Sequence, residues 1–316
     1  MNSTLASVGL PLALAVIMFG LGLSLTTEDF ARIARHPKVV AIALACQVVL
    51  LPLAAFGLVV LFDLEPLLAV GMVLLAASPG GITANLFSHL FGGDVALNIS
   101  LTAVNSIIAV VTVPVVTNVA IDHFEPAGLG AVGLQFGKMV QVFAIVLVPV
   151  VIGMWVRHIR AGFAVRMDRP VRIGSALILL MAILGTMVSE RSNLAGYFMD
   201  VGAVAALFCL VSLTAGYWIP RLLGADRRQG IACSMEVGIH NSALAITMAV
   251  GVLGSSRMAV PAAVYGAVMA PLALLVGWSI SRRTDRAHAA RTRSGAADVI
   301  TIDRDRADID DSAAHS

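Results

Sequence analysis

Residues 233–245 read CSMEVGIHNSALA and place a glutamate, a histidine and an asparagine inside a long apolar run. The run extends over residues 228–253, which is long enough to cross a lipid bilayer as a helix. Charged and strongly polar side chains are costly at that depth, so they indicate a functional site such as an ion site. Gly238, between Glu236 and His240, favours a break in the helix at the same place.

The composition indicates a membrane protein. Hydrophobic residues make up 59% of the 316 residues and charged residues only 13%, and the mean hydropathy is +0.92. A soluble domain cannot bury that much apolar surface, so the lipid bilayer surrounds most of the chain. The net charge of +2 gives no indication of a nucleic-acid partner. No obligatory protein partner is inferred either.

Nine apolar runs are long enough to be transmembrane helices. They cover residues 5–25, 38–62, 66–91, 95–119, 132–157, 171–189, 198–221, 228–253 and 258–281. With nine spans, 18 of the 21 lysines and arginines lie on the side of the C-terminal tail, which the positive-inside rule assigns to the cytoplasm. We therefore expect an all-α multi-pass protein of the cytoplasmic (inner) membrane with its N-terminus outside. The charged residues 282–316 are expected to form a disordered cytoplasmic tail.

A second apolar run contains the sequence ASPGGITANLF and is expected to break as well. Pro79 lacks an N–H, and Gly80 and Gly81 tolerate non-helical dihedral angles. The helix after each break has a proline inside it, Pro114 in one case and Pro271 in the other. The two units are spans three and eight, so they cross the membrane in opposite directions. This pattern predicts an inverted-topology repeat with two crossing discontinuous helices, a plan that secondary transporters use.

Four stretches together resemble the bile acid:sodium symporter family. They are IMFGLGLSL (17–25), HPKVV (36–40), SPGGITANLFSHLFGGDVALNISLT (78–102) and EVGIHNSALA (236–245). The resemblance, which is to bacterial members, covers essentially the whole chain apart from the tail. It implies sodium-coupled import of an organic anion by a core domain that rocks against a panel domain. Within a transmembrane domain of residues 1–281, the core would be 38–119 and 198–281, and the panel 5–25 and 132–189.

The resemblance implies a first sodium site built from side-chain oxygens, the ligands that a hard cation prefers. Its residues would be Asn85, Asn98, Thr102 and Glu236. Glu236 is the only carboxylate predicted well inside a span, so it must be paired, protonated or bound to a cation. A salt bridge to Lys138 is the alternative, although that lysine is placed to reach water. Ala84 stands where a serine hydroxyl contributes in relatives, so one ligand is lost.

The resemblance also implies a second sodium site, in which side-chain and backbone groups of five residues take part. These are Gln47, Glu236, Val237, Ile239 and His240. His240 is a departure, because many relatives have glutamine there and imidazole offers no oxygen to sodium. Histidine exchanges a proton near neutral pH, so we hypothesise that the second site is weakened or that His240 carries a proton in place of one sodium. A neutral histidine bonded to a neighbouring hydroxyl is the alternative.

Asn241 and Ser242 follow the second break and, with Asn85, are candidates for the substrate cavity. The N–H groups at a helix N-terminus could meet a substrate carboxylate. The resemblance implies that the substrate is an organic anion, either bile-acid-like or a small carboxylate. A proton-coupled or exchange carrier on the same fold is the alternative function. An intramembrane enzyme is disfavoured, because the sequence has no H-E-x-x-H pair and no G-x-S-x-G motif. Sodium is the expected coupling ion, and no other metal is expected.

Overall fold

The computed structural model describes residues 15, 16, 18–20, 22, 23, 35–126, 136–167, 170, 171, 173, 174, 177 and 194–281. Within those residues every regular element is a helix, and the only strand-like pairing is one isolated backbone bridge. Four helices are long and apolar enough to cross a membrane: Pro37–Leu61, Val95–Phe124, Met199–Leu222 and Ser256–Ser281. The prediction of a helical multi-pass membrane protein is confirmed. The predicted spans 5–25 and 171–189 lie largely, and the tail 282–316 wholly, outside the described residues.

The first long helix contains a wide turn at its centre. It consists of α3 (Pro37–Ala45), the π-helical turn η2 (Cys46–Leu50) and α4 (Leu51–Leu61). Pro52 has no N–H to donate to the carbonyl group of Val48, and the helix widens just before it. The wide turn holds the buried side chain of Gln47. Turns of this kind are frequent at functional sites.

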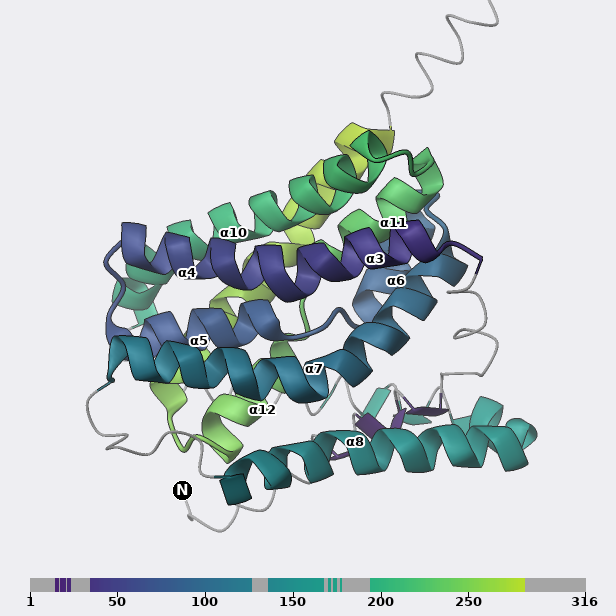
Figure 1. Ribbon diagram of the computed structural model, residues 1–316, viewed down its shortest axis with the longest axis horizontal. Coiled ribbons are helices and arrows are strands. Elements are labelled where there is room, and N and C mark those ends of the chain that lie inside the picture. Colours follow the sequence, from purple (N-terminus) through teal and green to yellow (C-terminus); the bar gives the residue numbers. More distant parts are fainter. Residues whose placement is uncertain are drawn as a thin grey trace, which may run out of the picture.

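Two helices are broken near the middle. One consists of α5 (Pro66–Ala77) and α6 (Ile82–Leu90), with the irregular residues 78–81 between them (Figure 1). The other consists of α11 (Arg227–Gly238) and α12 (Ser242–Gly251). α11 contacts α6, and α12 contacts α5. The two broken helices therefore cross at their breaks.

The remaining helices surround this crossing. They are α7 (Val95–Phe124), α8 (Phe136–Ile159), α10 (Leu194–Leu222) and the last helix, Ser256–Ser281. α7 packs along α5, α10 packs along α11, and α8 packs against α7 (Figure 1). α7 extends beyond the predicted limit of residue 119, because its hydrogen bonds continue through Asp122 and His123 after the apolar run has ended.

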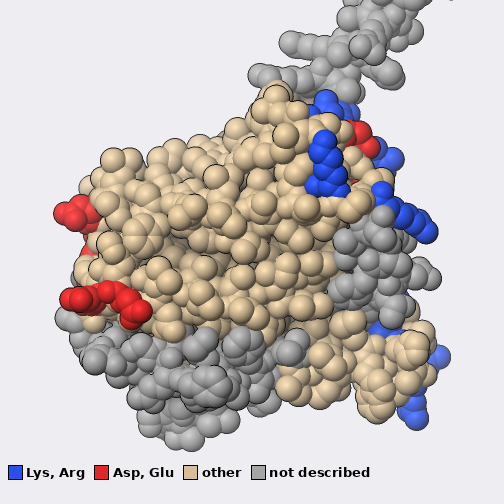
Figure 2. Space-filling model, viewed as in Figure 1, with Lys and Arg blue, Asp and Glu red and all other residues tan. Residues whose placement is uncertain are grey.

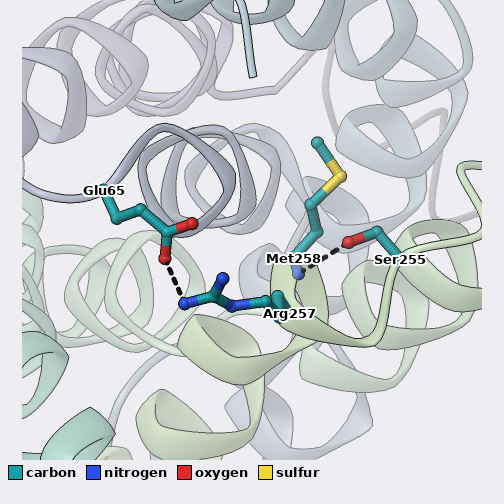
Figure 3. A network of polar contacts seen from close by, with 4 residues as sticks. All are labelled: Glu65, Ser255, Arg257 and Met258. Carbon is teal, nitrogen blue, oxygen red and sulfur yellow. Dashed lines mark hydrogen bonds and ion pairs between the residues drawn. The ribbon is translucent and has the colours of Figure 1, made fainter. Parts of the chain in front are cut away.

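The start of α5 is attached to the start of the last helix (Figure 3). The carboxylate of Glu65 forms an ion pair of 2.7 Å with the guanidinium group of Arg257. The hydroxyl oxygen of Ser255 accepts a hydrogen bond of 3.3 Å from the backbone N–H of Met258. Six residues after Glu65, a Cβ on Gly71 would overlap the carbonyl oxygen of Met258. Glycine is therefore required where these two helices touch.

Most basic side chains in view lie at one end of the molecule with a few acidic ones among them, other acidic side chains lie at the opposite end, and a largely uncharged surface lies between (Figure 2). The acidic end comprises the loop between α4 and α5 and the end of α7, with Asp63, Glu65, Asp122 and Glu125. The basic end includes the starts of α3 and α11, with Lys38, Arg227 and Arg228. This distribution is expected for a protein whose two ends meet water and whose middle meets lipid.

Candidate functional site

The two helix breaks are bonded to each other through their backbones. The N–H of Asn241 donates a hydrogen bond of 2.9 Å to the carbonyl oxygen of Pro79. Gly80 and His240 form an antiparallel bridge beside it. The C-terminal ends of α5 and α11 and the N-terminal ends of α6 and α12 therefore meet at one point. Carbonyl groups at the helix C-termini favour a cation there, and N–H groups at the N-termini favour an anion.

Glu236 lies in the last turn of α11, at this crossing, with only 2% of its surface exposed. The hydroxyl of Thr102 donates a hydrogen bond of 2.5 Å to its Oε2, and the amide of Asn105 donates one of 3.5 Å to its Oε1. Within the part of the chain that the structure describes, it is the only buried acidic side chain and has no ion pair. Neutral donors do not balance a buried negative charge, so the carboxyl group must be either protonated or bound to a cation. The side chain of Lys138, the predicted alternative partner, lies outside the described side chains.

Gly80 allows the carboxylate to lie against the first break. A Cβ on Gly80 would come within 2.5 Å of the carboxyl carbon and both carboxyl oxygens of Glu236. A Cβ on the neighbouring Gly81 would meet no atom within 4 Å. The two glycines therefore differ: one makes room for Glu236, and the other contributes only flexibility at the break.

One face of α7 supplies polar side chains to the same place. Asn98, Thr102 and Asn105 are spaced by four and three residues, so they lie on one side of the helix, and all three are buried. The amide nitrogen of Asn98 donates a hydrogen bond of 2.7 Å to the carbonyl oxygen of Ala232 in α11. Its Oδ1 is buried and has no hydrogen-bond partner among the described residues, and the same is true of the Oδ1 of Asn85 in α6. Oxygen atoms buried without a donor are available to coordinate a cation.

The predicted second site is arranged differently. The amide nitrogen of Gln47 donates to the carbonyl oxygen of Ser78 at 2.9 Å, and the Nδ1 of His240 lies 3.1 Å from the same oxygen. The carbonyl group of Val237 has lost its usual helical partner, because the N–H of Asn241 is bonded to Pro79 instead. Ile239 follows the end of α11, and its side chain is buried. These predicted residues therefore lie close together, but nitrogen donors occupy part of the site.

Of the three residues predicted to line the substrate cavity, Asn241 also has a structural role. The side-chain oxygen of Asn241 accepts a hydrogen bond of 3.1 Å from the N–H of Leu244, so it caps the N-terminus of α12. Ser242 is buried near Gly266 of the last helix, and its hydroxyl has no partner among the described residues. Asn85 lies in α6, near the other break. The cavity role of all three stays a prediction.

Three residues that contribute to this region were not predicted from the sequence: Asn105, Ser78 and Tyr265. The spacing of Asn105 from Asn98 and Thr102 on one helical face is a signal that identifies it. Ser78 takes part through its backbone carbonyl group, which residue type does not reveal. The hydroxyl of Tyr265 donates a hydrogen bond of 2.7 Å to the carbonyl oxygen of Gly238, a contact that depends on how the last helix packs.

Comparison with known proteins gives consistent matches. A family model described as Sodium Bile acid symporter family matches residues 11–197, more than half of the chain. The sodium-dependent transporter YocS of Bacillus subtilis (strain 168) is 27% identical over 252 residues, which are 80% of this chain and 76% of that protein. The ileal sodium/bile acid cotransporter of Homo sapiens is 24% identical over 254 residues, 78% of this chain and 70% of that protein.

A plant relative is also similar. The probable chloroplastic sodium/metabolite cotransporter BASS1 of Arabidopsis thaliana is 28% identical over 257 residues, 79% of this chain. Those residues are 61% of that protein, so the chain spans less than two thirds of its length. All of these relatives are transporters rather than enzymes. With broken helices crossing at a buried carboxylate and a family model matching more than half of its residues, the chain belongs to the Sodium Bile acid symporter family, a family of transporters.

Proposed function

We propose that this chain is a secondary active transporter that couples the entry of sodium to the uptake of a small organic anion by alternating access. The relatives are described as a sodium-dependent transporter, a sodium/metabolite cotransporter and a sodium/bile acid cotransporter. These descriptions support sodium as the coupling ion and an organic anion as the substrate, either bile-acid-like or a small carboxylate.

One observation carries this proposal: the buried carboxylate of Glu236 lies at the crossing of the two breaks, and α6 and α7, which contact α11, carry buried amide oxygens with no partner among the described residues. We assign the first sodium site to Asn85, Asn98, Thr102 and Glu236. The unpartnered oxygens of Asn85 and Asn98 would complete the shell around a cation that Glu236 neutralises. The site takes residues from three helices, α6, α7 and α11, so sodium would stabilise one particular packing of those helices.

The proposed transport cycle needs two bodies that move against each other. We propose residues 38–119 and 198–281 as the core and residues 5–25 and 132–189 as the panel. Close packing between the first span and α8 supports a panel that moves as a unit. A Cβ on Gly22 would overlap the carbonyl oxygen of Val150, and a Cβ on Gly153 would overlap that of Phe19, so these helices touch through their backbones.

The proposal includes nine spans, an inverted repeat and an N-terminus outside the cytoplasmic membrane. The antiparallel bridge between Gly80 and His240 supports the repeat, because the two breaks cross in opposite directions. The segregation of basic and acidic side chains at the two ends supports the orientation (Figure 2). Substrate binding at the N-terminal ends of α6 and α12 is supported by the positive end of the helix dipole, which favours an anion there.

Transport by the purified protein in liposomes tests the proposal. Radiolabelled bile acids, keto acids and other small carboxylates are offered with an inward sodium gradient, with sodium equal on both sides, and with potassium only. We expect one of these anions to accumulate only with the sodium gradient, and Glu236→Gln to abolish accumulation. Glu65→Gln is the matched control, because it makes the same change in a carboxylate at the surface. Accumulation driven by a proton gradient in sodium-free buffer would contradict the proposal and favour the proton-coupled alternative.

A further inference from the structure

The imidazole ring of His240 lies between the two helix breaks, where the second sodium was expected. We infer that this ring takes the place of a second cation and that the transporter therefore binds one sodium ion per chain. The inference rests on the proposed function, because it concerns the number of coupling ions. Three observations support it: the hydrogen bonds of the ring, its packing against aromatic side chains, and the kinds of atoms nearby that could coordinate a cation.

The bonding of the ring fixes which nitrogen carries the proton. The Nδ1 of His240 lies 3.1 Å from the carbonyl oxygen of Ser78, which can only accept a hydrogen bond, so Nδ1 carries a hydrogen and donates it. The same oxygen accepts a second hydrogen bond, 2.9 Å long, from the amide nitrogen of Gln47. Two N–H groups thus converge on Ser78. Their positive ends oppose a cation at this carbonyl group and leave it no free lone pair.

Aromatic side chains hold the ring in this position. Phe208 of α10 stacks on it, with ring centroids 5.3 Å apart and an interplanar angle of 23°. Tyr265 of the last helix meets it edge to face, with centroids 5.4 Å apart. The hydroxyl of Tyr265 is itself bonded to the carbonyl oxygen of Gly238. Because His240 is only 2% exposed, its ring cannot swing aside without displacing two packed aromatic rings.

The atoms that remain near the ring make a poorer sodium shell than those of the predicted first site. In the predicted first site, the Glu236 carboxylate and the side-chain atoms of Asn85 and Asn98 that have no partner among the described residues are all oxygens. On the side of Gln47, the two buried side-chain atoms with no partner among the described residues are the Oε1 of Gln47 and the Nε2 of His240, and the backbone carbonyl of Val237 lacks its usual helical donor. Sodium, like other hard cations, prefers several oxygens to an imidazole nitrogen. The first group offers only oxygens and includes a carboxylate, whereas in the second a ring nitrogen stands where an oxygen is needed and Ser78 is already bonded to two N–H groups, so the second group suits sodium less well.

Direct measurement of bound sodium tests the inference. Purified full-length protein is dialysed against radioactive sodium at constant ionic strength, with potassium as the replacing ion, and the sodium bound per chain is counted at saturation. We expect one ion for the wild type. In His240→Gln an amide oxygen replaces the ring nitrogen, and we expect the bound sodium to double. The Glu236→Gln substitution, made in the wild type or in His240→Gln, should abolish the sodium binding that is counted.

Each outcome of this experiment bears on the inference. Two ions on the wild-type chain would overturn it while leaving the proposed function intact. No sodium bound in preference to potassium would overturn the proposed function itself, and the inference with it. One ion on both the wild type and a folded His240→Gln would show that the ring does not take the place of a cation. The wild-type measurement alone decides the stoichiometry, so the test does not depend on the variant being stable.

Discussion

The hydroxyl of Thr102 donates a hydrogen bond of 2.5 Å to the carboxylate of Glu236, which lies 134 residues further along the chain. The same hydroxyl lies 3.0 Å from the carbonyl oxygen of Asn98, one turn earlier in α7. A threonine whose hydroxyl formed a hydrogen bond only within its own helix would not reach the carboxylate. This contact joins the polar face of α7 to the end of α11, so a change in the spacing of these helices would change the proposed ion site.

Replacing Thr102 by valine keeps the shape of the side chain and removes its hydroxyl. A hydrogen bond to a charged group contributes about 1.5–3 kcal/mol, so we expect sodium affinity to fall roughly 10- to 100-fold. The fall is measured as a rise in the sodium concentration needed for half-maximal thermal stabilisation. Thr117→Val is the matched control, because Thr117 is buried in the same helix and its hydroxyl has no partner among the described residues. Equal effects of the two substitutions would contradict a specific role for Thr102.

Gly80→Ala tests whether the first break must approach the carboxylate. The added methyl group would come within 2.5 Å of the Glu236 carboxyl atoms, so we expect sodium-dependent stabilisation and transport to be lost. Gly81→Ala places the same group where no atom lies within 4 Å, in an extended backbone that alanine adopts without strain. We expect this control to retain sodium binding. If both variants bind sodium like the wild type, the carboxylate does not require the space beside Gly80.

The contact between Tyr265 and Gly238 gives a prediction about stability. Tyr265→Phe keeps the ring that packs on His240 and leaves the buried carbonyl group of Gly238 without its donor. We expect the free energy of unfolding to fall by about 1–3 kcal/mol, measured by denaturant titration in detergent. Ser212→Ala is the control, because its hydroxyl is bonded only to the helical carbonyl of Phe208. A loss in Tyr265→Phe no larger than that in Ser212→Ala would mean that the hydroxyl does not hold the end of α11.

The local features of this fold follow from the sequence. Pro79 with two glycines, and Gly238 between polar residues, are signals that act within a few residues of themselves, and α5 and α11 end beside them. The importance of Glu236 also follows, because a carboxylate in an apolar run is costly wherever the helix packs. Neither conclusion depends on distant contacts.

The contacts around His240 and Glu236 do not follow from the sequence. Phe208 and Tyr265 are separated from His240 by 32 and 25 positions in the sequence, and only the packing of α10 and the last helix brings them to its ring. Ser78 contributes a backbone oxygen, for which the side chain gives no signal. Asn105 lies on the same helical face as Thr102, but nothing in α7 alone indicates that this face meets α11.

We propose that Glu236 is the centre of a sodium site, and the thermal stability of the purified protein tests this without a substrate. The wild type and Glu236→Gln are melted in sodium and in potassium at equal ionic strength, with no substrate present. A ligand that binds only the folded state raises stability by mass action, so we expect sodium to raise the melting temperature of the wild type above its value in potassium. We expect Glu236→Gln to melt at the same temperature in both salts. Equal melting of the wild type in the two salts, or sodium-specific stabilisation that survives in Glu236→Gln, would contradict the claim.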